Sequence, residues 1–92
     1  MTTTDARGTA QSKLDALVAL IAAPGGAATP ELLQECDALK QAIAAFHLEA
    51  IRFRMFNVDR MLTRSGASGS ARQLFEEVRA SLETAGFHTR SH

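Results

Sequence analysis

No glycine or proline occurs between Pro30 and Gly66, and this uninterrupted segment constrains the fold more than any other feature of the sequence. Thr29 is suited to cap a helix and Pro30 to occupy its first position, so the pattern predicts one helix over residues 30–64. At 1.5 Å per residue that helix would be about 52 Å long, whereas a compact chain of this size has a diameter somewhat above ~30 Å. The helix must therefore bend, with Asn57 as the expected position, or project from the fold towards a partner.

Clusters of helix-breaking residues lie on both sides of this segment, at residues 24–29 and 65–70. Apolar residues recur at helical spacing before the first cluster and after the second. We therefore expect an all-α fold, an elongated helical bundle with three helices in the order short, long, short. The predicted helices cover about residues 10–23, 30–64 and 71–85.

The third predicted helix carries signals at both ends. Ser70 and Gln73 have the spacing of a capping box at its start. Gly86 is suited to the left-handed conformation that ends many helices, and Phe87 is placed to contact Leu82 in a Schellman motif. This helix is therefore the best defined of the three.

The composition agrees with a small helical domain. Hydrophobic residues make up 46% of the chain and aromatic residues only 5%, which disfavours both a disordered tail and a β-sandwich. The ten basic and ten acidic residues cancel, so neither a strongly basic protein that wraps nucleic acid nor an acidic tail is expected. The single cysteine excludes a disulfide within the chain and a cysteine-based zinc site.

The sequence shows no targeting signal. Its first residues lack the basic region of a secretory signal, and its most apolar stretch, residues 14–23, is about half as long as a membrane span requires. We therefore expect a cytoplasmic protein with no membrane partner. The expected organisation is one helical domain with flexible ends: a flexible N-terminal segment (1–9), the domain (10–87) and a flexible C-terminal tail (88–92).

Two apolar stripes run along the predicted long helix. The first has the spacing of a coiled-coil seam and consists of Leu32, Cys36, Leu39, Ile43, Phe46, Ala50 and Phe53. The second lies about a third of a turn away, and two short helices offer too few apolar side chains to cover both stripes. The sequence therefore predicts a homodimer through the long helix, with a monomeric three-helix bundle as the alternative. The predicted partner or dimer interface is Leu48, Ile51, Met55, Phe56, Val58 and Leu62.

Arginines gather around the cluster of helix-breaking residues at 65–70. The planar guanidinium group suits a carboxylate or a phosphate, so these residues are candidates for binding an anion or an acidic partner. The alternative is a solvated face with ion pairs inside the chain, such as Arg60 with Glu76 or Glu77. The candidates are Arg52, Arg54, Arg60, Arg64 and Arg72.

No catalytic residue, metal ligand or cofactor site is predicted. Cys36 lies between the acidic residues Glu35 and Asp37, which would raise the pKa of its thiol, so a buried structural role is expected. His47 has isoleucines four residues away on both sides and no orienting acid. The pair His88 and His92 follows the end of the last predicted helix and offers no third metal ligand.

These patterns favour a non-enzymatic module for protein–protein interaction, acting as a homodimer in an adaptor, regulatory or assembly role. A second hypothesis is a nucleic-acid-associated helical dimer whose arginine cluster contacts phosphates; its binding would weaken steeply with salt. A third, a small enzyme that holds an anionic substrate with arginines across a dimer, is less favoured because no general base is positioned.

Overall fold

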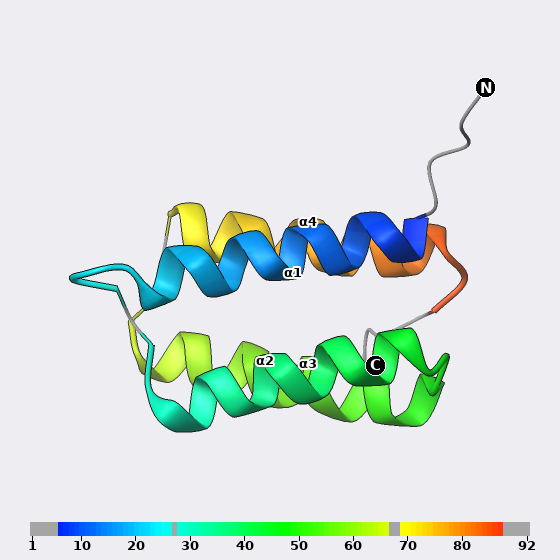
Figure 1. The fold of residues 1–92 in the computed structure, drawn as a ribbon, viewed down its shortest axis with the longest axis horizontal. Coiled ribbons are helices and arrows are strands. Elements are labelled where there is room, and N and C mark those ends of the chain that lie inside the picture. Colours follow the sequence, from blue (N-terminus) through cyan, green and yellow to red (C-terminus); the bar gives the residue numbers. More distant parts are fainter. Residues whose placement is uncertain (1–5, 27, 67–68, 88–92) are drawn as a thin grey trace.

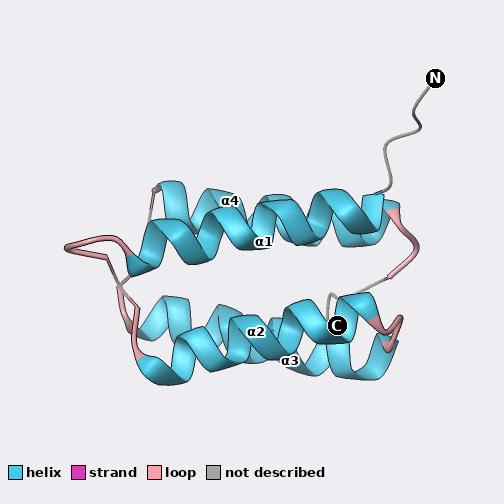
Figure 2. Ribbon diagram, viewed as in Figure 1, coloured by secondary structure: helices cyan, strands magenta, loops and turns pink. Residues whose placement is uncertain are grey.

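The computed structural model describes residues 6–26, 28–66 and 69–87. Four helices account for most of these residues, and the described ranges contain no strand: α1 (Ala6–Ala22), α2 (Pro30–Ala44), α3 (Leu48–Arg64) and α4 (Ser70–Thr84). Successive helices run in opposite directions, and they form two layers, α1 beside α4 and α2 beside α3 (Figures 1 and 2). The predicted all-α class and helical bundle are confirmed, but the prediction of three helices is wrong.

The predicted helix over residues 30–64 is two helices. α2 ends at Ala44 and α3 begins at Leu48, so the chain reverses at residues 45–47 and not near Asn57. Asn57 lies within α3, where its side-chain amide donates a hydrogen bond of 3.1 Å to Glu35 of α2. The reversal keeps the longest dimension of the molecule at 39 Å, well below the ~52 Å of a straight helix.

The end of α2 is a Schellman motif without a glycine. The amide of His47 donates to the carbonyl of Ala42 at 3.1 Å, and the amide of Phe46 donates to the carbonyl of Ile43 at 3.2 Å. Phe46 occupies the left-handed position with φ 59°, the one positive φ among described residues other than glycine. Because glycine usually fills this position, the local sequence did not predict a helix end here.

The reversal brings both predicted apolar stripes into one core. From α2 the core takes Leu32, Cys36, Leu39, Ala42 and Ile43, and from α3 it takes Ile51, Met55, Val58 and Leu62. The two stripes are therefore offset in angle because they lie on two helices joined by a turn, and not because one helix has two apolar sides. The other buried core residues of the described ranges all come from the α1–α4 layer: Ala10, Leu14, Leu17, Ile21, Ala71, Phe75, Val78 and Leu82.

This core changes the argument for a dimer. The residues Ile51, Met55, Val58 and Leu62, which the sequence assigned to a dimer or partner interface, are at most 1% exposed within a single chain. The bundle therefore covers them without a second copy, and a continuous coiled-coil seam along residues 32–53 is not formed. Of the six residues assigned to the interface, Leu48 and Phe56 remain exposed.

The helix boundaries differ from the predictions at several points. α1 begins at Ala6, so residues 6–9, expected to be flexible, are helical. At the start of α4 the cap residue is Gly69, with no side-chain cap, so the predicted capping box of Ser70 and Gln73 is wrong. The predicted N-terminal cap of α2 is confirmed, since the Thr29 hydroxyl accepts a hydrogen bond of 3.1 Å from the amide of Leu32. Residues 1–5 and the predicted tail, 88–92, lie outside the described residues.

Candidate functional site

The outer face of α3 carries two exposed aromatic side chains. Phe53 and Phe56 are 56% and 55% exposed. They are three residues apart on the helix and so lie on the same side, away from the buried face formed by Ile51, Met55 and Val58. Rings of this size favour burial because each exposes a large apolar area to water. The outer face of α3 is therefore the first candidate for contact with another molecule.

Three arginines of α3 accompany the two rings. Arg52, Arg60 and Arg64 are all exposed, and the guanidinium carbon of Arg60 lies 5.5 Å from the centroid of the Phe56 ring. Among the described side chains, no carboxylate forms an ion pair with any of these three arginines. We call this surface the aromatic–basic face; it consists of Arg52, Phe53, Phe56, Arg60 and Arg64.

The other two candidate arginines have partners within the chain. Nη1 of Arg54 donates to both carboxylate oxygens of Glu35, at 3.1 and 2.9 Å, and so joins α3 to α2. Nη1 of Arg72 donates to Asp59 at 2.7 Å and joins α4 to α3. The predicted arginine cluster thus divides into two residues that stabilise the bundle and three that remain on its surface.

A second ion pair between α3 and α4 involves Arg79, an arginine that the sequence analysis did not single out. Arg79 Nη1 donates to both oxygens of Glu76 at 2.9 Å, and Nη2 reaches Asp59 at 3.5 Å. Glu77, the other predicted partner of Arg60, pairs instead with Lys13 of α1 at 2.8 Å, and this ion pair and a hydrogen bond from Gln73 lower the pKa of the Glu77 carboxyl. Arg79 lies seven residues after Arg72 and therefore on the same side of α4. This spacing could have predicted that both arginines face the same carboxylate of α3.

A groove adjoins the basic end of this face. It has a volume of about 350 Å³ and lies where the start of α2 meets the end of α3. Leu32 and Met61 supply apolar lining, and Arg64 and Glu31 contribute charged groups. An apolar side chain of a bound partner could therefore be accommodated beside Arg64.

Phe53 was placed incorrectly by the sequence pattern. It continued the first apolar stripe at coiled-coil spacing, yet its side chain points away from the core. Its helical position could have predicted this exposure. In a helix that buries Ile51, Met55, Val58 and Leu62, Phe53 falls on the opposite side.

Among the remaining candidates, the described residues Cys36 and His47 show no site chemistry. Cys36 is buried, and burial together with the charge of Glu35 raises the pKa of its thiol to about 11, so it stays protonated and unreactive near neutral pH. His47 is exposed at the start of α3, and its side chain makes no capping hydrogen bond. His88 and His92 lie outside the described residues. Within the described part of the chain, no three side chains of His, Cys, Asp or Glu are grouped as metal ligands.

No protein-family model, curated protein or solved structure matches this chain. None of the helices in the described ranges is long and apolar enough to cross a membrane.

Proposed function

We propose that this protein is a non-enzymatic interaction module that binds an acidic, amphipathic helix of another protein through the aromatic–basic face of α3. The observation that carries the proposal is the exposure of Phe53 and Phe56 beside three arginines that have no carboxylate partner among the described residues. Aromatic residues and arginines are also the residue types that contribute most to binding energy at protein interfaces.

The chemistry of the face selects the partner. Apolar side chains on one side of a helix would cover the two phenylalanine rings, and each half-exposed ring contributes on the order of 1 kcal/mol when it is buried. Carboxylates flanking that apolar side would accept charge-assisted hydrogen bonds from Arg52, Arg60 and Arg64. A helix with leucines at its centre and glutamates at its edges therefore matches both properties of the face.

The same charges disfavour a second copy as the occupant of this face. Two aromatic–basic faces that meet across a two-fold axis would bring six arginines together, and the one acidic residue on the exposed side of each α3 is Glu49. Like charges in an interface oppose association. We therefore place the expected homodimer second to an acidic partner as a use of this surface.

Nucleic acid is the other candidate considered from the sequence. Three exposed arginines provide a small basic footprint on a chain with zero net charge, whereas proteins that bind nucleic acid usually present a larger one. We therefore treat binding of an oligonucleotide to this face as an alternative outcome of the experiment.

The test uses a fluorescent synthetic peptide that forms an amphipathic helix of leucine and glutamate, with a scrambled peptide of equal composition as the control. The fluorescence anisotropy of the peptide, titrated with the full chain, should show saturable binding of the helical peptide only. Phe53→Ala with Phe56→Ala, and separately Arg52→Glu with Arg60→Glu, should weaken binding about tenfold or more. Leu20→Ala, which truncates an exposed apolar residue of α1, should leave binding unchanged.

Four results would contradict the proposal. The first is equal binding of the helical and scrambled peptides, and the second is binding that the α3 variants do not weaken. The third is tight, salt-sensitive binding of a single-stranded oligonucleotide with no peptide binding, which would assign the face to nucleic acid. A dimer that dissociates in the Phe53→Ala, Phe56→Ala variant would assign the face to a second copy.

A further inference from the structure

The turn between α2 and α3 differs from the other connections of the bundle. The α1–α2 connection contains Pro24, Gly25 and Gly26, and the α3–α4 connection contains Gly66 and Gly69. Residues 45–47 are Ala-Phe-His and contain no helix-breaking residue. A residue with a side chain is strained in the left-handed conformation, so the φ of 59° at Phe46 works against this turn.

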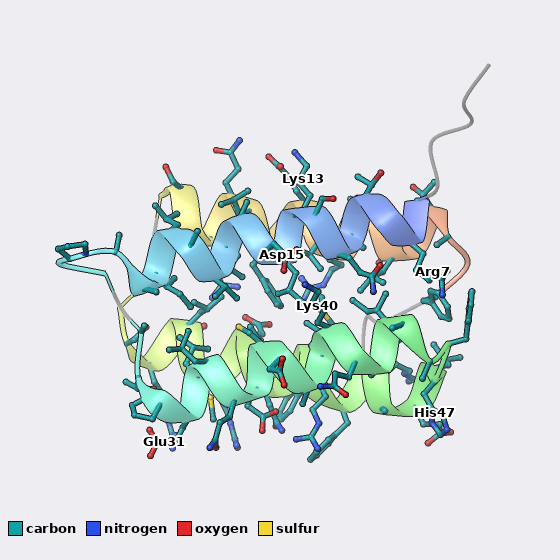
Figure 3. The ribbon with its side chains drawn as sticks, viewed as in Figure 1. Arg7, Lys13, Asp15, Glu31, Lys40 and His47 are labelled. Carbon is teal, nitrogen blue, oxygen red and sulfur yellow. The ribbon has the colours of Figure 1, made fainter. Side chains whose placement is uncertain are left out.

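Residues of the turn contact distant parts of the chain. The guanidinium carbon of Arg7 lies 3.9 Å from the centroid of the Phe46 ring, and Nη1 of Arg7 donates to the carbonyl of Ala44 at 3.2 Å. The Phe87 ring lies 6.0 Å from the Phe46 ring. Arg7 and His47 can be seen at the same end of the bundle in Figure 3. The Phe46 ring nevertheless remains 62% exposed, so burial of this ring does not explain the turn.

A straight conformation of the turn has a defined geometric consequence. If residues 45–47 become helical, α2 and α3 join into one helix of about 52 Å, which is longer than the 39 Å bundle. The two halves of this helix then point away from each other and cannot pack together. The core surfaces of α1–α2 and of α3–α4 must therefore find the same surfaces on a second chain.

We propose that two copies of this chain exchange halves at the α2–α3 turn and form a domain-swapped dimer. In this dimer α1 and α2 of one chain pack against α3 and α4 of the other, so the contacts between α1 and α4 and between α2 and α3 are all made between chains. Opening the turn removes the strain at Phe46 twice and lets the first amides of α3 donate to the last carbonyls of α2, against the loss of freedom on association. Short, strained hinges favour such exchange.

The ion pair between Glu35 and Arg54 provides a test specific to exchange. It joins α2 to α3 at 2.9 Å, so it lies within one chain in the monomer and between two chains in the exchanged dimer. Glu35→Arg and Arg54→Glu each place like charges together within their own monomer. In an exchanged heterodimer of the two variants, one site has the reversed pair and the other has the original pair, so both sites are restored.

The two variants, one with a mass tag, are refolded separately and as an equimolar mixture from denaturant at high chain concentration. Light scattering and native mass spectrometry of the full chain should show a larger fraction of dimer in the mixture than in either variant alone, with the heterodimer as its main species. The Glu35→Arg, Arg54→Glu double variant, which restores the pair within one chain, should behave like the unmodified protein. Absence of the heterodimer, or equal amounts of the heterodimer and the two homodimers, would overturn the proposal.

The matched variants Phe46→Gly and Phe46→Ala test the hinge itself. Both remove the ring, but only glycine relieves the left-handed strain of the closed turn. The association constant for dimerisation of the glycine variant should be at least about tenfold lower than that of the alanine variant. The effect counts twice because the dimer contains two hinges. Equal constants, or an unmodified chain that remains a 9.9 kDa monomer after refolding at high concentration, would refute domain exchange. The exchanged dimer leaves the aromatic–basic face exposed, so peptide binding and dimerisation can fail independently.

Discussion

The ends of α2 and α4 have the same hydrogen-bond pattern and different sequences. At the end of α4 the amide of Phe87 donates to the carbonyl of Leu82 at 2.8 Å, and the amide of Gly86 donates to the carbonyl of Glu83 at 3.0 Å. The equivalent bonds at the end of α2 start from His47 and Phe46. Both helices therefore end in a Schellman motif, with φ 98° at Gly86 and 59° at Phe46.

Local residues explain one of these two ends. At α4, glycine occupies the left-handed position and the following phenylalanine packs partly against the core, as expected for this motif. At α2, a phenylalanine occupies the left-handed position and the exposed His47 follows it. The turn at α2 must therefore be imposed by packing of the helices on both sides, because its own residues favour a continuing helix.

The largest effect is expected from the apolar packing at the end of α4, where Leu82 is buried and Phe87 lies against the core. Leu82 is fully buried at the third position before the cap, so Leu82→Ala should lower the free energy of unfolding by about 2–5 kcal/mol through lost burial and a cavity. His47→Ala, at the exposed position after the α2 cap, should change it by less than about 0.5 kcal/mol. Urea denaturation at low chain concentration measures both. Similar losses for the two variants would show that the end of α2 also depends on a local apolar contact.

A smaller loss is expected when the glycine of the α4 motif is replaced. Gly86→Ala should destabilise the protein by about 1–2 kcal/mol, because alanine is strained at φ 98°. An added Cβ at Gly86 has no heavy atom within 4 Å, so a clash would not contribute. Thermal unfolding followed by circular dichroism measures the change. A neutral result would mean that the end of α4 tolerates a side chain as the end of α2 does.

The smallest effect is expected from the reciprocal change at α2. Phe46→Gly should stabilise the monomer by about 0.5 kcal/mol, because the relief of strain exceeds the entropy that glycine loses on folding and the weak contacts of the exposed ring. The same thermal unfolding experiment, at a chain concentration where the protein is monomeric, measures this change. Destabilisation by more than about 1 kcal/mol would show that the contacts of the Phe46 ring hold the turn, and the contrast with Gly86 would then be weaker than proposed.

Much of the fold could be predicted from local patterns. The start of α2 at Thr29 and Pro30 and the end of α4 at Gly86 follow from backbone chemistry within a few residues. The spacing of Ile51, Met55, Val58 and Leu62 correctly predicted one apolar face, although it could not show whether a second chain or this chain covers that face. The candidate site was predicted only in part, since Arg52, Arg60 and Arg64 remain exposed while Arg54 and Arg72 pair within the bundle.

The sequence by itself determined that the chain is helical, where its first and last strong helix signals lie, and that apolar residues follow helical spacing, because these properties depend on neighbours one or two turns away. Only the tertiary structure decided that the chain reverses at Phe46, that the core closes within one chain and that Phe53 faces outward. Burial of two apolar stripes in one core stabilises the fold by more than the strain of a single left-handed residue costs. That balance depends on contacts between α1–α4 and α2–α3, which no local pattern contains.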